Sequence, residues 1–128
     1  MDKVQHFELP AQDMARAKKF YSSVFGWKTQ DVPGMEYAMA STVEVDEKTR
    51  MPKEPGAING GIVKKGMGMD TPSITITVAD IDKAVQKATK AGGKLAKEKQ
   101  PVMDMGFVAY IQDTEGNLVG LWQSARKQ

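Results

Sequence analysis

The chain contains no cysteine and only one histidine, His6, among its 128 residues. The absence of cysteine excludes disulfides, thiolate nucleophiles and thiolate metal ligands. A single histidine leaves few nitrogen ligands for a transition metal, because protein metal sites are built from His, Cys, Asp and Glu. The chemistry available to this chain therefore rests on His6, on carboxylates and on hydroxyl groups.

Long hydrophobic runs and a large excess of charge are also missing. No apolar run approaches the roughly 20 residues that a membrane-spanning helix needs, so we expect no membrane partner. The net charge is only +2 and the lysines are scattered, so we expect no nucleic-acid partner. The first residues include Asp2, Lys3 and His6, and this polar start is not typical of a secretory signal peptide. We therefore expect a cytoplasmic protein.

An internal repeat is present instead. A shift of 67 residues places His6–Asp13 on Ser73–Asp80 and also superposes Gly26 on Gly93. Each half reads as a strand, an aspartate, an amphipathic helix, a glycine and then further strands. The repeat therefore predicts two βαβββ modules in succession.

An aspartate and a glycine bound each predicted helix. Asp13 and Asp80 are suited to cap the first turn, because a carboxylate accepts its free N–H groups. The first helix should end at Gly26 and the second at Gly92. Apolar residues recur at helical spacing in both segments. The two apolar stripes comprise Met14, Ala17, Phe20, Tyr21 and Val24, and Ile81, Ala84, Ala88 and Ala91.

Period-two alternation assigns the faces of the two repeated strands. The even-numbered residues of 73–78 are apolar and should face the helix, while Ser73 and Thr75 should face away. By the same rule, His6 and Glu8 should face away from the first helix. Further strands are predicted at Trp27–Asp31, Met35–Ser41, Ile58–Lys64, Lys94–Lys97, Phe107–Gln112 and Asn117–Gln123, with a long loop at 42–57.

Three segments resemble one protein superfamily. The opening HFELPAQDMARAKKFYSSVFGWK (His6–Lys28) resembles the start of a vicinal oxygen chelate domain, the group of glyoxalase I, bleomycin-resistance proteins and extradiol dioxygenases. The ending YIQDTEGNLVGLWQ (Tyr110–Gln123) resembles its final hairpin, whose usual turn is Asp-Pro-x-Gly. With INGGI (Ile58–Ile62), the similarity is closest to the glyoxalase-related branch.

The resemblance implies an α+β fold. Its two βαβββ modules form a curved mixed sheet that is shaped like a cup. On this chain they would occupy residues 1–64 and 71–126 of a single domain, 1–128, joined by a linker at 65–72. The resemblance also implies a homodimer.

In the metal enzymes of this superfamily, the resemblance implies a divalent ion held by His, Glu or Gln side chains from both modules. The corresponding positions here are His6, Ser73, Gly120 and either Gly61 or, with a slip of one residue, Gly60. Only His6 retains a ligand-type side chain, whereas a catalytic site needs about three protein ligands. We therefore expect neither a catalytic metal nor another cofactor, with a loosely bound divalent metal as the alternative.

His6 and Glu8 are the candidate catalytic residues. A carboxylate beside an imidazole favours the imidazolium and raises its pKa, and such a pair can transfer protons or bind an anion. The alternative is a polar edge without chemistry. The candidate substrate-binding residues are Ser73, Thr75, Leu118, Gly120, Trp122 and Gly61. Trp122 has an alternative place in the sheet core, and Trp27 and Tyr37 are assigned to structure.

The predicted function is that of a glyoxalase-related protein that binds a small organic ligand in its cup without a catalytic metal, as bleomycin-resistance members do. One alternative is a lactoylglutathione-lyase-like or isomerase enzyme that uses His6 and Glu8, with or without a loosely bound divalent metal. Another is a domain that has lost its site and serves as an interaction partner. Whether the chain is an enzyme depends on which alternative holds.

Overall fold

The computed structural model describes residues 1–66 and 68–125 and divides into two compact units. The N-terminal unit is His6–Pro72, and the C-terminal unit combines Met1–Gln5 with the chain from Ser73 onward. Two predicted features fall partly outside the described residues: Met67 of the linker and residue 126 at the end of the second module. The predicted domain boundaries stay a prediction.

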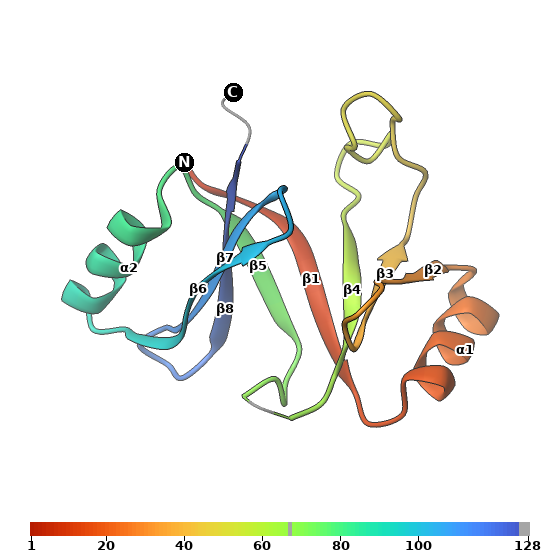
Figure 1. Cartoon of the computed structure of the whole chain (residues 1–128), viewed down its shortest axis with the longest axis horizontal. Helices are drawn as coiled ribbons and strands as arrows, with labels where there is room; N and C mark the ends of the chain where they lie inside the picture. Colours follow the sequence, from red (N-terminus) through yellow and green to blue (C-terminus); the bar gives the residue numbers. More distant parts are fainter. Residues whose placement is uncertain (67, 126–128) are drawn as a thin grey trace. The chain divides into compact units, whose positions relative to one another are not determined.

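The N-terminal unit contains one βαβββ module, as predicted. Its elements are β1 (Lys3–Ala11), α1 (Met14–Phe25), β2 (Lys28–Asp31), β3 (Tyr37–Ser41) and β4 (Asn59–Lys64). The strand order is β2-β3-β4-β1, with β1 and β4 parallel and the other pairs antiparallel. The segment between β3 and β4 projects beyond the ends of both strands (Figure 1).

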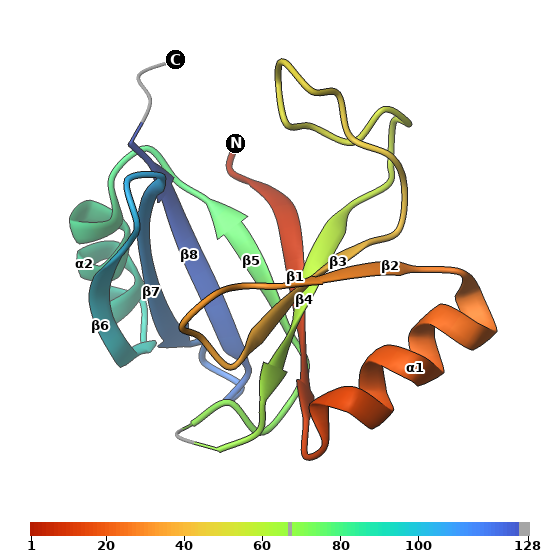
Figure 2. The ribbon, with the colours of Figure 1, turned by 45° about the vertical axis from the view of Figure 1, so that its right-hand side comes forward.

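The C-terminal unit repeats this plan. Its elements are β5 (Ser73–Thr77), α2 (Ile81–Lys90), β6 (Lys94–Val102), β7 (Gly106–Gln112) and β8 (Leu118–Ser124). The strand order is β5-β8-β7-β6, with β5 and β8 parallel, and these strands lie side by side in Figure 2. β6 runs past its predicted end at Lys97, because two register irregularities let it follow β7 as far as Val102.

β1 is shared between the units. Its first three residues, Lys3–Gln5, belong to the C-terminal unit, and the remainder belongs to the N-terminal unit. One contact that ties this end of the strand is the hydroxyl of Thr77, which donates to the Gln5 side-chain oxygen at 2.7 Å.

Alanines form much of the core beneath α1. Ala11, Ala38, Ala40 and Ile62 are buried, and Met14, Ala17, Tyr21 and Trp27 pack against them. Phe20 and Val24, predicted on the packed stripe, are instead 54% and 56% exposed. The prediction was wrong for these two residues because the face of α1 that packs on the sheet is narrower than the apolar face predicted from the sequence. Asp13 caps the helix by accepting from Arg16 N at 3.0 Å, and Gly26 ends it at a φ of 74°.

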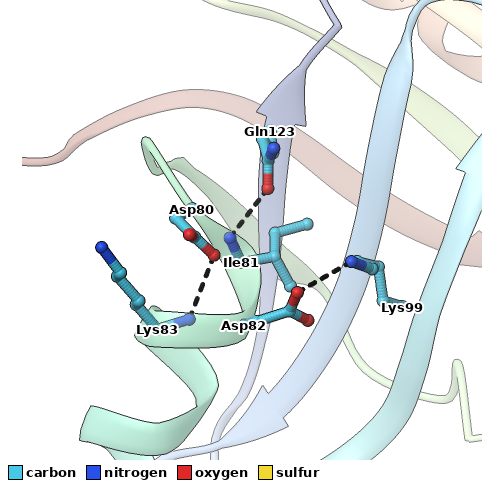
Figure 3. Close-up of polar contacts among 6 residues, drawn as sticks. All are labelled: Asp80, Ile81, Asp82, Lys83, Lys99 and Gln123. Carbon is cyan, nitrogen blue, oxygen red and sulfur yellow. Dashed lines mark hydrogen bonds and ion pairs between the residues drawn. The ribbon is translucent and has the colours of Figure 1, made fainter.

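Three polar contacts fix the first turn of α2 (Figure 3). The Ile81 amide donates to Gln123 Oε1 of β8 at 2.9 Å, and the Lys83 amide donates to the capping Asp80 carboxylate at 3.2 Å. Lys99 of β6 forms an ion pair with Asp82 at 2.9 Å. The helix is thereby held to two strands of its own unit. The apolar contact beneath it is formed by the buried residues Val78, Ile81, Ala109 and Leu121, with Ile76 and Ala84 beside them.

None of the helices in the described part of the chain is both long enough and apolar enough to cross a membrane.

Candidate functional site

The only histidine of the chain has a protein partner. His6 Nε2 lies 2.7 Å from the hydroxyl of Tyr37, the first residue of β3. The two rings are almost parallel, at 12° with their centroids 6.5 Å apart. The tautomer of the imidazole decides which group donates, because either ring nitrogen can carry the proton. The hydrogen bond holds the phenol and the imidazole as one polar pair.

Gly61 makes room for this pair. It lies opposite Glu8 on β1 and opposite Met39 on β3. A Cβ atom on Gly61 would overlap the Tyr37 hydroxyl, so a side chain here and the present position of Tyr37 exclude each other. A Cβ on Gly60 would meet the Phe7 ring at 2.6 Å on the other face. Of the two predicted alternatives, Gly61 is therefore the residue on the His6 face.

Burial dominates the electrostatics of His6. Desolvation lowers the pKa of the imidazole below its ordinary value of 6.5, while the nearby Glu8 carboxylate acts in the opposite direction and raises it. The expectation of a raised pKa was wrong in its net direction, because burial outweighs the carboxylate. Glu8 itself is only 6% exposed. The imidazole of His6 is therefore neutral at pH 7.

The predicted binding residues of the C-terminal unit also gather on one part of their sheet. Ser73 and Thr75 are buried on β5, and Thr75 pairs with Gly120 of β8. A Cβ atom on Gly120 would lie 2.9 Å from the Thr75 hydroxyl oxygen and 3.3 Å from the Tyr110 ring. A side chain at residue 120 would therefore crowd both the Thr75 hydroxyl and the Tyr110 ring.

Two further predicted residues lie on β8. Leu118 is half-buried and pairs with Gln112 at one end of the strand. Trp122 is half-buried and pairs with Val108. The Trp122 ring occupies the space that Gly106 leaves, since a Cβ there would meet the ring at 2.7 Å. Part of the Trp122 ring thus packs against the sheet of its own unit.

An open cleft of about 520 Å³ lies on the N-terminal unit, and none of the predicted site residues lines it. Asp13, Lys18, Asp31 and Lys64 contribute to its lining, and Tyr37 is the one member of the polar pair that reaches it. Lys18 and Asp31 form an ion pair at 2.8 Å across part of this lining. Sequence reasoning assigned no ligand site to this cleft.

Tyr37 is the residue of the candidate site that sequence reasoning assigned to structure. It stands before Ala38 and Ala40, which are buried under α1, so alternation puts Tyr37 on the opposite face of β3. This is the face to which Gly61 belongs. The signal that could have identified it was a tyrosine diagonal to a glycine on the neighbouring strand, since Tyr37 pairs with Val63 and Gly61 lies two residues before Val63 on β4.

The residues at the four ligand positions do not fit a divalent metal. His6 Nε2 is hydrogen-bonded to the Tyr37 hydroxyl. A side chain at residue 61 would overlap the Tyr37 phenol, and Gly120 has no side chain that could bind a metal. The fourth position holds the neutral hydroxyl of Ser73. No group of three His, Cys, Asp or Glu side chains able to hold a metal occurs within residues 1–66 and 68–125.

Comparison with known proteins places the chain in a family. The model of the glyoxalase/bleomycin resistance protein/dioxygenase superfamily matches residues 3–121. The chain belongs to this superfamily, and the predicted fold class is confirmed.

Two curated relatives and one solved structure illustrate the similarity. "Putative glyoxylase CFP32" of Mycobacterium bovis is 34% identical over 126 residues, which are 93% of this chain and 44% of the relative. Lactoylglutathione lyase GLX1 of Arabidopsis thaliana is 29% identical over 108 residues, covering 81% of this chain and 38% of the relative. This chain thus spans less than half the length of both relatives. A methylmalonyl-CoA epimerase bound to methylmalonyl-CoA and NH₄⁺ has a TM-score of 0.64 at 16% identity, covering 98% and 96% of the two chains.

Proposed function

We propose that this chain is a glyoxalase-related protein that binds a small organic ligand and works without a catalytic metal. The observation that carries the proposal is the 2.7 Å hydrogen bond between His6 Nε2 and the Tyr37 hydroxyl. A histidine binds a metal through a ring nitrogen, and here that nitrogen is used by a phenol. The remaining ligand positions supply a hydroxyl or no side chain.

The same residues suit recognition of a ligand. A neutral imidazole and a phenol can each donate or accept a hydrogen bond, and buried Glu8 adds an acceptor beside them. Small-molecule sites combine a few placed polar groups of this kind with mostly apolar surroundings. His6, Glu8 and Tyr37 would then orient one polar group of the ligand.

Metal content and ligand binding test the proposal together. The untagged protein, purified without chelator, should contain no stoichiometric transition metal by mass spectrometry. A thermal-shift screen of small organic compounds should include lactoylglutathione and methylmalonyl-CoA, which appear in the names of a relative and of a structural neighbour. At least one compound should raise the melting temperature.

Matched variants make the screen specific. Tyr37→Phe should lose most of the ligand-induced shift, whereas Tyr21→Phe should keep it, because Tyr21 packs with the core under α1. Stoichiometric metal that disappears in His6→Ala would refute the proposal. So would a complete absence of binding across the screen.

The second candidate is an enzyme, a lyase or isomerase that uses His6 and Glu8. The neutral, partly buried imidazole beside the buried Glu8 carboxylate favours it, because a general base must be unprotonated at the working pH. The test is turnover of a compound found in the screen, followed by His6→Ala. Full activity of His6→Ala would end this candidate.

The homodimer implied by the family resemblance is part of the proposal and is tested separately. The mass of one chain is 14.0 kDa, and sedimentation at micromolar concentration should give twice that mass. A monomer at all concentrations would remove the dimer from the proposal without affecting the ligand site.

A further inference from the structure

Three lysines gather on the outer face of α2. Lys83, Lys87 and Lys90 stand at positions i, i+4 and i+7 of the helix, so their side chains share one face. The opposite face, which includes Ile81 and Ala84, packs on the sheet of the same unit. All three lysines are exposed. Lysines that are scattered in the sequence thus form a basic surface, which we call the lysine stripe and define by these three residues.

The charge of the lysine stripe is not balanced by carboxylates among the described residues. None of its three members forms an ion pair within residues 1–66 and 68–125. The two carboxylates at the start of the helix are engaged elsewhere (Figure 3): Asp80 accepts the Lys83 amide, and Asp82 pairs with Lys99 of β6. Like charges three and four residues apart on a helix repel one another. The stripe is therefore unfavourable for the helix that carries it.

The internal repeat shows that the fold does not require these lysines. The shift of 67 residues places them on Arg16, Phe20 and Ser23 of α1, of which only the first is basic. The helix macrodipole favours cations in the last turn of a helix, but Lys83 lies in the first turn of α2. Neither the shared fold nor the macrodipole accounts for a cation at all three positions.

We propose that the lysine stripe is a docking surface for a partner protein, which presents an acidic segment to α2. The stripe runs over seven residues, which is about 10 Å along the helix. Asp or Glu side chains one turn apart on a partner helix match this spacing. Opposite charges across an interface speed association and fix the orientation of the partners. The proposal does not depend on the ligand site at His6 and Tyr37.

The composition of α2 favours an acidic protein over other polyanions. The helix (IDKAVQKATK) contains neither arginine nor an aromatic residue. Surfaces that bind single-stranded nucleic acids stack the bases on aromatic rings, and arginine binds phosphate in a bidentate manner. An amphipathic helix binds a membrane through its apolar face, and that face of α2 is covered by the sheet. A lysine ammonium can bind a carboxylate as a point charge without either feature.

Two variants with the same change of net charge test the proposal. The stripe variant replaces the three lysines of the stripe by glutamine. The control variant replaces three exposed lysines of the N-terminal unit, none of which forms an ion pair in the described part of the chain: Lys19→Gln, Lys28→Gln and Lys48→Gln. The probes are hexaglutamate, the neutral hexaglutamine and a six-nucleotide oligothymidylate. Amide chemical shifts at low salt measure the binding of each probe.

Hexaglutamate should shift the amide signals of α2 in the wild type and in the control variant. Its affinity should be about tenfold or more lower in the stripe variant, a change of about 1.4 kcal/mol. Binding should disappear in about 1 M sodium chloride, where the Debye length is about 3 Å. Hexaglutamine should leave the signals unchanged.

An equal loss of affinity in both variants would mean that only net charge matters, and it would overturn the proposal. Absence of shifts in α2 would overturn it too. Tighter binding of the oligothymidylate than of hexaglutamate would identify a nucleic-acid surface instead.

Far-UV circular dichroism checks that both variants fold like the wild type. If the stripe variant does not fold, the single variants Lys87→Gln and Lys28→Gln replace the two triple variants. Hexaglutamate should then bind about threefold more weakly to Lys87→Gln than to Lys28→Gln, because one exposed charge pair contributes little. Equal affinities of these two single variants would overturn the proposal.

Discussion

The Tyr37 hydroxyl lies 2.7 Å from His6 Nε2 and occupies the space into which a side chain at Gly61 would extend. Three strands are thereby linked through one phenol: β1 carries the imidazole, β3 the tyrosine and β4 the glycine. A side chain at residue 61 and the His6–Tyr37 hydrogen bond exclude each other. The first two predictions follow from this relationship.

Gly61→Ala should destabilise the protein by about 1–3 kcal/mol, because the added methyl group forces Tyr37 away from His6. Urea denaturation measures the change. In a Tyr37→Ala background the same substitution should cost much less, since the overlapping phenol is gone. A double-mutant cycle without coupling between these residues would contradict the geometry.

The stability of the protein should depend on the ionisation of His6. Its pKa in the folded state is lowered below 6.5 by burial, so the unfolded chain takes up this proton first as the pH falls. Stability should therefore be constant above about pH 7.5, fall as the pH drops through 6.5 and level off below the folded-state pKa. Because His6 is the only histidine, its ring signals in NMR report this pKa directly.

His6→Gln serves as the control for this titration, because it removes the ionisable ring. It should abolish the decline in stability between pH 6.5 and the folded-state pKa. An NMR pKa at or above 6.5 would show that the Glu8 carboxylate, and not burial, dominates.

Gln123 should matter to α2 although it lies on β8. Its side-chain oxygen accepts the Ile81 amide at 2.9 Å, which satisfies one of the free N–H groups of the first helical turn. Gln123→Ala should cost about 0.5–2 kcal/mol, the range typical of a lost N-terminal cap. Hydrogen exchange at Ile81 should accelerate, whereas Gln123→Glu, which keeps the acceptor, should retain protection.

Asn59 anchors the long segment between β3 and β4. Its side-chain oxygen accepts the amides of Thr42 at 2.7 Å and Val43 at 3.2 Å. Asn59→Ala should cost about 0.5–1.5 kcal/mol for each hydrogen bond lost and speed proteolysis within 44–57. Asn59→Asp, which keeps both acceptor lone pairs, should be cleaved more slowly than Asn59→Ala. Equal cleavage of the two variants would contradict the anchoring role.

The parts of the fold that the sequence predicted are those determined by local chemistry. Capping by Asp13 and Asp80 and the left-handed Gly26 follow from their neighbours in sequence, and both modules were found in the predicted order. Alternation also placed His6 on the correct face of β1. The features that could not be predicted depend on contacts between residues far apart in the sequence and on how deeply each residue is buried.

Three cases show the limit. Tyr37 was assigned to structure because its contact with His6 spans 31 residues, and sequence order does not reveal which strand lies beside β1. The pKa of His6 depends on how far burial exceeds the influence of Glu8, which spacing alone cannot measure. The exposure of Ile74 reflects where α2 stops covering the sheet, since α2 covers Ile76 and not Ile74.

The division of β1 between the two units has a consequence for the order of events during synthesis. Gln5 is made before the rest of β1, yet it meets its hydrogen-bond partner Thr77 only after 72 further residues have been made. Contacts of such long range delay folding, because the intervening loop must close before they form. Until the C-terminal unit has been made, Lys3–Gln5 at the start of β1 lack their partner in that unit. Other chains can pair with this exposed strand end during that time.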